Sequence, residues 1–220
     1  MASTKSTSIT LEEGASRAGL ALSDQQLNQL RAYLTMLQKW NKVYNLTAVR
    51  DPAEMLTHHL LDSLAVIPSL LRQCGDKPFK LLDVGSGGGL PGAVIAICCP
   101  EARVSCVDTV AKKAAFQQQI ALELRLPNLR GIHARVETLT EPQDIVCSRA
   151  FASLIDFTQW TGKSVAAGGV WMAMKGKHPA EELAVLPPEV QVFHVEQIIV
   201  PGLDAERCIV WMKPAPVQAA

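Results

Sequence analysis

The sequence predicts an α/β protein built on a doubly wound, mostly parallel sheet, with a helical extension at its N-terminus. Two observations carry this prediction. From residue 77 onward, short apolar runs alternate with helix-like stretches, as in chains that fold into a covered parallel sheet. The first of these runs, LLDVGSGGGLPGAVIAI (81–97), breaks into five glycines within eight residues and then turns apolar again. A bare backbone at that point is typical of a ligand-binding turn between a strand and a helix.

The composition fits a globular protein and limits its partners. Of the 220 residues, 48% are apolar and 19% are charged, and 21 Lys and Arg balance 21 Asp and Glu. Any affinity for nucleic acid must therefore come from local basic patches. The start, MASTKSTSIT, has no apolar signal region, and no run approaches the ~18 apolar residues of a membrane span. We expect a cytoplasmic protein that does not contact the membrane.

The six cysteines form no CxxC pair, and four of them lie in apolar runs. They are interpreted as reduced, buried thiols rather than as disulfides or metal ligands, and no metal is expected.

The segment 10–76 has a helical period, and we predict it to be a helical extension between a flexible tail (1–9) and the sheet domain. Ser23, followed three residues later by Gln26, resembles a capping box. The apolar residues that follow recur at steps of three and four; they are Leu27, Leu30, Leu34 and Leu37. These leucines are expected to pack against the rest of the protein.

A further long helix is expected after Asp51, with Pro52 at its first position. Its apolar stripe would consist of Leu56, Leu60, Leu64, Ile67 and Leu71. A shorter helix is expected near 11–18. The extension would end at the turn-rich stretch GDKP (75–78).

The Rossmann-like domain is expected to span 77–214 and to be followed by a second flexible tail (215–220). Its strands are predicted at 80–84, 103–107, 129–133, 144–148, 170–174, 190–195 and 208–212. Its helices are predicted near 92–98, 110–124, 154–164 and 180–186. The last two strands are joined only by a short link, which predicts an antiparallel pair at one edge of the sheet.

Two acidic residues accompany the glycine loop. Asp83 precedes Gly85 by two residues, and Asp108 closes the second predicted strand, where an acid can accept both hydroxyls of a ribose. The pattern Gly87-x-Gly89-x-x-Gly92 alone is weak evidence for a dinucleotide, and no Lys-Ser/Thr follows it as in a phosphate-binding P-loop. An acid at position 83 suits a ligand ammonium group or the loop backbone better than it suits a pyrophosphate.

A ligand with a ribose, an amine and no phosphate fits these residues, and S-adenosylmethionine has that chemistry. The alternatives left open are that both acids merely cap the loop, that the chain is an NAD(P)-dependent oxidoreductase, that it methylates a small molecule, or that it is a non-catalytic RNA-binding or assembly factor.

From Trp40 to Met212 the chain resembles the bacterial small-subunit rRNA guanine-N7 methyltransferases, once called glucose-inhibited division protein B. The matching stretches are WNKVYNLTAVRDP (40–52), HLLDSL (59–64), DVGSGGGLPG (83–92), RVE (135–137), SRAFASL (148–154), MKGK (174–177) and ER (206–207). The resemblance implies a class I S-adenosylmethionine-dependent methyltransferase with a seven-stranded sheet, its last strand antiparallel. It also implies that the reaction transfers a methyl group to N7 of one guanine, guanine 527, in the 530 loop of 16S rRNA.

The resemblance also implies site residues. Gly85 and Leu90 would line the methionine side of S-adenosylmethionine, together with the rest of the loop; Asp108 would bind the ribose. Val136 and Glu137 would flank the adenine. The full set expected to contact the cofactor is Asp83, Gly85, Gly87, Gly89, Leu90, Asp108, Val136, Glu137 and Arg149. A basic residue is expected before His59, whereas this chain has His58 there, and His59 and Asp62 could form a local pair.

Guanine N7 carries a lone pair and no proton, so its methylation needs in-line placement but neither a general base nor a covalent enzyme intermediate. Arg149 is the one residue assigned to catalysis, by positioning the target or the cofactor. Phe151 or Trp160 could stack on a displaced base.

Six basic residues are expected to contact RNA at the carboxyl edge of the sheet: Lys112, Lys113, Arg135, Lys175, Lys177 and Arg207. The expected partner is 16S rRNA within the 30S subunit or its precursor. A monomer with no obligate protein partner is expected.

Overall fold

The computed structural model describes residues 9–75 and 77–216, so residues 1–8 and 217–220 of the two predicted tails, 1–9 and 215–220, lie outside the described residues. The described chain forms one seven-stranded sheet with strand order β3-β2-β1-β4-β5-β7-β6. The strands are β1 (Lys80–Val84), β2 (Arg103–Asp108), β3 (Leu129–His133), β4 (Gln143–Arg149), β5 (Val165–Lys175), β6 (Val190–Ile198) and β7 (Arg207–Pro214). All seven predicted strands are confirmed, most of them longer than the sequence indicated.

The first five strands are parallel, and β7 runs antiparallel to both of its neighbours, β5 and β6. This confirms the predicted antiparallel strand. It also has a consequence for the site: because β7 is reversed, its first residue, Arg207, lies at the same edge of the sheet as the last residues of β4 and β5. Ile198 of β6 pairs with Arg207, and Lys175 pairs with Cys208.

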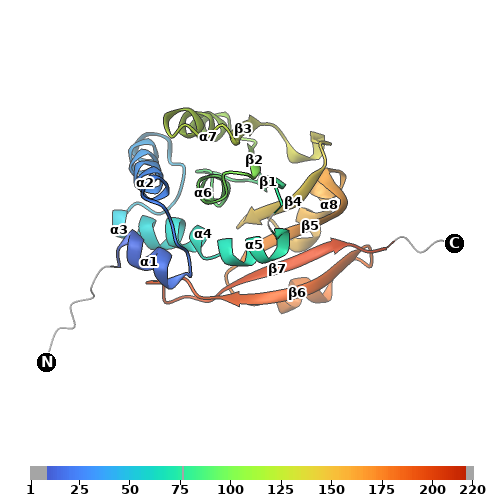
Figure 1. Cartoon of the computed structure of the whole chain (residues 1–220). Coiled ribbons are helices and arrows are strands. Elements are labelled where there is room, and N and C mark those ends of the chain that lie inside the picture. Colours follow the sequence, from blue (N-terminus) through green and yellow to red (C-terminus); the bar gives the residue numbers. More distant parts are fainter. Residues whose placement is uncertain (1–8, 76, 217–220) are drawn as a thin grey trace, which may run out of the picture.

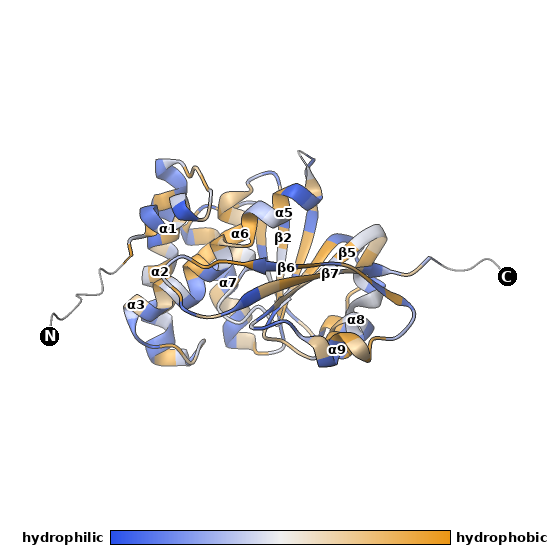
Figure 2. Cartoon of the chain, turned by 90° about the horizontal axis from the view of Figure 1, so that it is seen from below, coloured by the Kyte–Doolittle hydropathy of each residue, from blue (hydrophilic) through white to orange (hydrophobic). Residues whose placement is uncertain are grey.

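Helices cover both faces of the sheet (Figures 1 and 2). They are α6 (Gly92–Cys98), α7 (Ala111–Glu123), α8 (Leu154–Thr161) and α9 (Ala180–Ala184), with short 3₁₀ turns η2 (Val136–Thr138) and η3 (Gly162–Ser164). Successive strand residues enter different cores, as the two-residue period of a strand requires: Leu81 packs with α6, and Leu82 packs with α8. Figure 2 shows α5 and α6 on one side of the β6–β7 ribbon and α8 and α9 on the other.

The N-terminal extension begins with α1 (Leu11–Arg17) and α2 (Asp24–Tyr44), and both carry a complete capping box. Ser23 accepts a hydrogen bond from the backbone N–H of Gln26, and the Gln26 side chain accepts one from the Ser23 backbone, as predicted. Leu30 and Leu37 of the predicted stripe are fully buried.

The single helix predicted over the stripe 56–71 is wrong. Asp51 does cap a helix with Pro52 at its first position, but α3 (Pro52–Met55) passes into a π-helical turn, η1 (Leu56–Leu61), and then α4 (Asp62–Leu64). The chain breaks at 65–66, and α5 (Ile67–Cys74) follows with Pro68 in its first turn. Proline at that position cannot extend the preceding helix, because it lacks the backbone N–H. Leu71 of the stripe is exposed.

The extension and the sheet share one hydrophobic core. Tyr33 and Leu37 of α2 and Leu60 and Leu64 of the following helices pack in the same cluster as Ile95 of α6. The division of the chain into an extension of 10–76 and a domain of 77–214 stays a prediction. Within the described residues, no helix is both long enough and apolar enough to cross a membrane.

Candidate active site

The glycine loop joins β1 to α6 and folds back over the end of β2. The backbone N–H groups of Gly85 and Ser86 both donate to the carbonyl of Val107, at 2.9 and 3.3 Å. Gly85, Gly87 and Gly89 have φ values of 65°, 55° and 83°, which an L side chain rarely adopts. The glycines are therefore required by the backbone path itself, which exposes peptide groups on one side of the loop.

Asp83 supports this loop from beneath. Its Oδ2 accepts a hydrogen bond from the backbone N–H of Gly92 at 2.8 Å, while its Oδ1 is buried without a partner among the described residues. Burial raises the pKa of this carboxyl group from 3.8 to about 7, against the opposing effects of the Gly92 hydrogen bond and of Arg149. Of the two roles open to Asp83, the structure places its carboxylate on the loop backbone.

Asp108 ends β2 and contacts the loop from the other side. Its Oδ2 accepts from the backbone N–H of Gly87 at 3.0 Å, and its Oδ1 accepts from that of Val110 at 2.9 Å. Lys113 of α7 lies 3.8 Å from Oδ2. The acid is thus held by two peptide groups and by one cation, at the start of a helix.

A first cavity of about 370 Å³ opens above Asp108, and we call it the Asp108 cavity. It is lined by Gly85, Val107, Asp108, Thr109, Val110, Lys113, Ala134, Arg135, Val136, Glu137, Ala150, Phe151 and Trp160. Phe151 and Trp160 meet edge to face, with ring centroids 5.8 Å apart. The cavity therefore brings together the predicted ribose and adenine residues from β2 and η2, which are separate in the sequence.

A second cavity of about 650 Å³, the Arg149 cavity, lies on the other side of Gly85. It is lined by residues 46–49, His58, His59, Asp62, Gly85, Ser86, Gly87, Gly88, Leu90, Lys113, Arg149, Ala150, Met174, Lys175, Gly176 and Arg207. One wall thus comes from the helical extension, and the opposite wall comes from the ends of β4, β5 and β7.

Gly85, Lys113 and Ala150 line both cavities. Ala150 adopts φ 51°, a left-handed conformation that is uncommon for a residue with a side chain. This turn at the end of β4 places Arg149 in one cavity and Phe151 in the other. Asp83 and Gly89 line neither cavity.

Asp62 joins the extension to the sheet through two arginines. Its Oδ2 accepts from Nη1 of Arg149 at 2.9 Å, and its Oδ1 accepts from Nε of Arg207 at 2.7 Å. Arg149 Nη1 also donates to the carbonyl oxygen of His58 at 3.0 Å. The cluster stands at the boundary between the π-helical turn and α4; π-helical turns occur frequently at functional sites.

His59 does not pair with Asp62, so the local pair considered from the sequence is absent. Its Nε2 lies 2.6 Å from Oγ1 of Thr47 instead. Burial, followed by the charge of Arg149, lowers the pKa of His59 to about 4. His59 is therefore neutral at physiological pH. The His58 ring stays on its own helix, with Nδ1 3.2 Å from the carbonyl oxygen of Glu54.

The six predicted RNA-binding residues differ in how they are held. Four have carboxylate partners: Lys113 pairs with Asp108, Arg135 with Glu137, Lys175 with Glu182, and Arg207 with Asp62. Lys112 and Lys177 are exposed and have no carboxylate partner within the described residues. Neither Phe151 nor Trp160 lines the Arg149 cavity.

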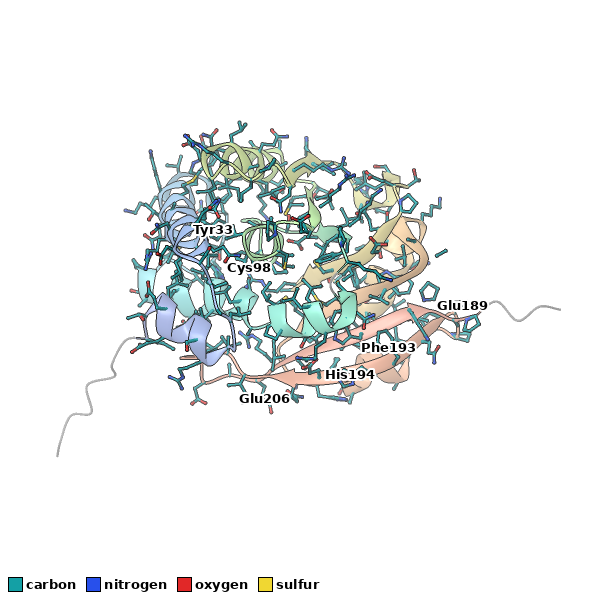
Figure 3. All side chains as sticks on the ribbon, viewed as in Figure 1. Tyr33, Cys98, Glu189, Phe193, His194 and Glu206 are labelled. Carbon is teal, nitrogen blue, oxygen red and sulfur yellow. The ribbon has the colours of Figure 1, made fainter. Side chains whose placement is uncertain are left out.

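Sequence reasoning missed two supports of the site. Thr47 lies in the stretch WNKVYNLTAVRDP, which carried a family resemblance but no assigned role. Tyr33 projects from α2 toward α6 (Figure 3), and its hydroxyl donates to the carbonyl oxygen of Gly88 at 2.8 Å. Burial raises the pKa of Tyr33, which keeps the phenol protonated as a donor.

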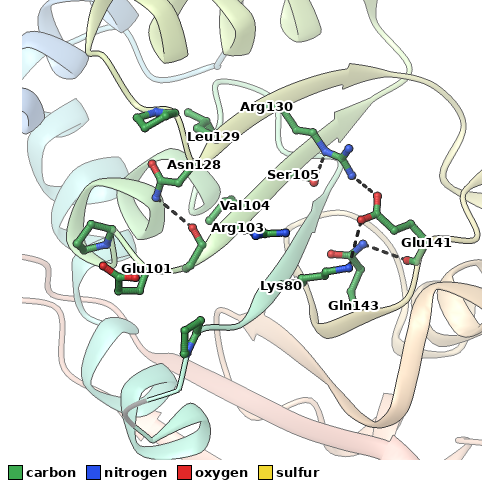
Figure 4. A pocket seen from close by; sticks show the side chains of 14 residues that line it. Lys80, Glu101, Arg103, Val104, Ser105, Asn128, Leu129, Arg130, Glu141 and Gln143 are labelled. Atoms are coloured by element: carbon green, nitrogen blue, oxygen red, sulfur yellow. Dashed lines mark hydrogen bonds and ion pairs between the residues drawn. The ribbon is translucent and has the colours of Figure 1, made fainter.

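A third cavity, of about 550 Å³, lies at the opposite edge of the sheet, around the first residues of β1, β2 and β3 (Figure 4). Its basic side chains are partly neutralised: Arg130 and Lys80 both pair with Glu141, and Arg130 Nε donates to Ser105. Ligands of open parallel sheets bind at the carboxyl ends of the strands, so this cavity is not part of the site.

The residues at the carboxyl edge fit S-adenosylmethionine. A Cβ added at Gly87 would meet no atom closer than 3.8 Å, so the loop backbone is open there, whereas at Gly85 it would lie 2.3 Å from the Phe151 ring, which packs against the bare backbone. The Asp108 cavity has a carboxylate for hydroxyl groups and aromatic faces for a base, whereas nothing in the loop offers the lysine of a P-loop.

Two solved methyltransferases are similar to this chain in fold. The chain is similar to the N-methyltransferase NodS from Bradyrhizobium japonicum in complex with S-adenosyl-l-homocysteine, with a TM-score of 0.56 and 12% identity over 85% of this chain and 98% of that one. It is also similar to a SAM dependent methyltransferase from Aquifex aeolicus, with a TM-score of 0.52 and 16% identity over 80% of this chain and 97% of that one. These similarities show the fold, a class I methyltransferase sheet.

Sequence comparison is more specific. The chain is 67% identical over 207 residues to the ribosomal RNA small subunit methyltransferase G of a Polaromonas species, covering 92% of each chain. It is 65% identical over 209 residues to the protein of that name from Polaromonas naphthalenivorans, covering 93% of this chain and 95% of that one. The family model for rRNA small subunit methyltransferase G matches residues 26–210, and the chain, an S-adenosylmethionine-dependent methyltransferase, belongs to this family.

Proposed function

We propose that the protein methylates N7 of guanine 527 in the 530 loop of 16S rRNA, by direct in-line transfer. The observation that carries the proposal is that two cavities meet at Gly85 and Ala150, one with residues suited to a nucleoside and the other walled in part by the helical extension. Membership of the rRNA small subunit methyltransferase G family speaks against an oxidoreductase and against a small-molecule methyltransferase.

The Asp108 cavity and the loop beside it would hold S-adenosylmethionine, which supplies the methyl group when bound. Asp108 would accept the ribose hydroxyls on the acceptor sites that its oxygens retain beside the hydrogen bonds from the Gly87 and Val110 N–H groups. Val136 and Glu137 would flank the adenine, and Gly85, Gly87 and Leu90 would border the methionine side. Asp83 and Gly89 would act indirectly, by holding the loop in shape.

The Arg149 cavity would receive the target guanine. N7 bears no proton, so no group there has to act as a base, and the neutral His59 fits this low demand. Arg149 carries a guanidinium that can donate to a carboxylate, to a phosphate or to guanine O6, and it would position the reactants rather than take a proton. Excluding water and fixing geometry can together supply several kcal/mol of the barrier.

The test is to incubate the purified protein with 30S subunits, and separately with protein-free 16S rRNA, in the presence of labelled S-adenosylmethionine. N7-methylguanine is then mapped by reduction and aniline cleavage of the rRNA. We expect label and cleavage at guanine 527 alone. Label at another nucleotide, or on a base without aniline-sensitive cleavage, would contradict the proposed position.

The contribution of Arg149 is tested in the same assay with Arg149→Ala. We expect a loss of about a hundredfold in kcat/KM, which is the scale associated with misplaced reactants. Methylation at the wild-type rate would remove Arg149 from the site. Thermal shift with S-adenosylhomocysteine and with NAD separates the cofactor classes, since only the former should stabilise the protein.

A further inference from the structure

Asp62 lies between Arg149 and Arg207, and the proposed function gives roles to the two arginines but none to the carboxylate that joins them. Its side chain is 3% exposed and accepts one arginine on each oxygen, Arg149 at 2.9 Å and Arg207 at 2.7 Å. The two arginines come from β4 and β7, strands that are separated by β5 in the sheet. One buried carboxylate thus spans two strands from a position on the helical extension.

Each guanidinium also donates to a backbone carbonyl, which belongs to the helical extension for Arg149 and to the preceding residue for Arg207. Arg149 Nη1 donates to the carbonyl oxygen of His58 at 3.0 Å, and Arg207 Nη1 donates to that of Glu206 at 2.8 Å. Within the described residues, the Nη2 groups of both arginines have no hydrogen-bond partner. Both side chains line the Arg149 cavity, so two anchored cations face it across a single anion.

A second ion pair between the same parts of the molecule shows the contrast. Glu196 of β6 pairs with Arg72 of α5 and accepts from Ser69, which also joins the extension to the C-terminal strands. Arg72 is 61% exposed, and neither Arg72 nor Glu196 lines the Asp108 cavity or the Arg149 cavity. An ion pair whose only role is to join the helical extension to the C-terminal strands needs neither a buried carboxylate nor two arginines that line a cavity.

We propose that Asp62 is a positioning residue that presents Arg149 and Arg207 to two different anionic groups. Arg149 is the last residue of β4, the strand next to β1 and its glycine loop, so it faces the carboxylate of the cofactor's methionine part. Arg207 lies two strands farther from the loop, so it faces a phosphate of the RNA beside the target guanine. The inference deepens the proposed function and rests on it.

Removing the negative charge of Asp62 distinguishes a positioning role from a purely electrostatic one, because the two predict opposite changes in ligand affinity. Asp62 is itself an anion, so attraction alone predicts that Asp62→Asn binds carboxylate and phosphate more tightly. Positioning predicts weaker binding, because the amide has one oxygen where the carboxylate has two, and its NH₂ group opposes one of the arginines. Asp62→Glu keeps the charge and both oxygens, displaced by one methylene, and should recover part of the loss.

The cofactor arm uses purified protein without RNA. Asp62→Asn should weaken S-adenosylhomocysteine binding by about tenfold, the scale of one lost hydrogen bond to a charged group. It should leave the affinity for 5′-methylthioadenosine, which lacks the amino-acid part, unchanged. Glu196→Gln is the matched control: it breaks the other bridge and should change neither affinity. An equal loss for both ligands, or tighter binding of S-adenosylhomocysteine, would overturn the inference.

The RNA arm uses Arg207→Gln and measures 30S binding against salt concentration. The slope of log K against log salt should fall by about one, as for one lost phosphate contact, while S-adenosylhomocysteine affinity stays at the wild-type value. An unchanged slope would overturn the assignment of Arg207. If Asp62→Asn does not fold, Arg207→Gln and Arg149→Lys still test the division of roles. Failure of the wild type to methylate both 30S subunits and protein-free 16S rRNA would refute the proposed function, whereas the cofactor arm, read without RNA, would still test Asp62.

Discussion

A carboxyl group beneath the glycine loop, that of Asp83, has the most unusual environment in the site. It is buried, only one of its two oxygens accepts a hydrogen bond within the described residues, and its pKa is raised from 3.8 to about 7. A carboxyl group whose pKa is raised by folding binds a proton in the native state at pH values where the unfolded chain has released it. Its contribution to stability is therefore fully present below about pH 4, falls as pH rises, and is lost above about pH 7.

We predict that Asp83→Asn removes this pH dependence, because the amide has no proton to lose. Near pH 4 the free energies of unfolding of wild type and variant should be similar, apart from a constant offset. Between pH 4 and 7 the variant should gain stability relative to the wild type, and the difference should be constant above pH 7. Urea unfolding at a series of pH values measures it. A difference independent of pH would show that Asp83 is ionised throughout.

At the scale of single residues, sequence reasoning worked where the chemistry is local. The glycine loop with Asp83, and Asp108 at the end of the next strand, could be predicted because each belongs to one strand–turn unit. The contacts of Asp62 could not be predicted, because its partners are 87 and 145 residues away along the chain. No spacing rule links residues on a helix, on β4 and on the reversed β7.

At the scale of elements, helix α6 packs closely against the sheet because its first residue is a glycine, Gly92. A Cβ added at Gly92 would lie 2.4 Å from Sγ of Cys106 and 2.8 Å from Oδ2 of Asp83, and both atoms are buried. We predict that Gly92→Ala destabilises the protein by about 1–3 kcal/mol, the usual cost of overpacking, and weakens cofactor binding because the loop shifts. Gly162→Ala is the control: its Cβ meets nothing within 4 Å, so its unfolding free energy should change by less than about 0.5 kcal/mol.

The N-terminus of α2 is a second element with a measurable role. Ser23→Ala removes the cap and should cost about 1 kcal/mol of unfolding free energy. Gln26→Ala should cost more, because Gln26 Nε2 also donates to the carbonyl oxygens of Ile97 and Cys98 at the end of α6. Urea unfolding of both variants tests the order. If Ser23→Ala costs as much as Gln26→Ala, the contact between the two helix ends contributes nothing.

Most elements could be predicted from periodicity, and the exception has a physical cause. Strands such as β1 and β4 are apolar on both faces because helices cover both, so their runs are continuous and easily found. The stripe 56–71 has helical spacing throughout, yet the structure interrupts it with a π-helical turn and a break before Pro68. Asp62 beside the turn has partners 87 and 145 residues away, and His59 contacts Thr47 in the loop after α2, so helical periodicity carries no information about either contact.

At the scale of the whole molecule, the neutral net charge leaves RNA recognition to the arrangement of a few cations. Lys112 stands in the first turn of α7 and Lys177 follows β5, so both emerge at the carboxyl edge of the sheet. Both are exposed, and neither has a carboxylate partner within the described residues. Lys113 differs, because it pairs with Asp108 and lines both cavities. Reversing the charge of Lys113 would therefore disturb the cofactor site as well.

We therefore predict that Lys112→Glu with Lys177→Glu weakens 30S binding and lowers its salt slope by about two, one for each lost phosphate contact, while S-adenosylhomocysteine affinity is retained. The matched control is Arg103→Glu with Lys163→Glu. This pair changes the net charge by the same amount, but at the opposite edge of the sheet: Arg103 is the first residue of β2, and Lys163 lies in η3, just before β5. Binding curves at several salt concentrations measure both pairs. If the control pair weakens binding as much, the RNA responds to total charge and not to the edge that carries the site.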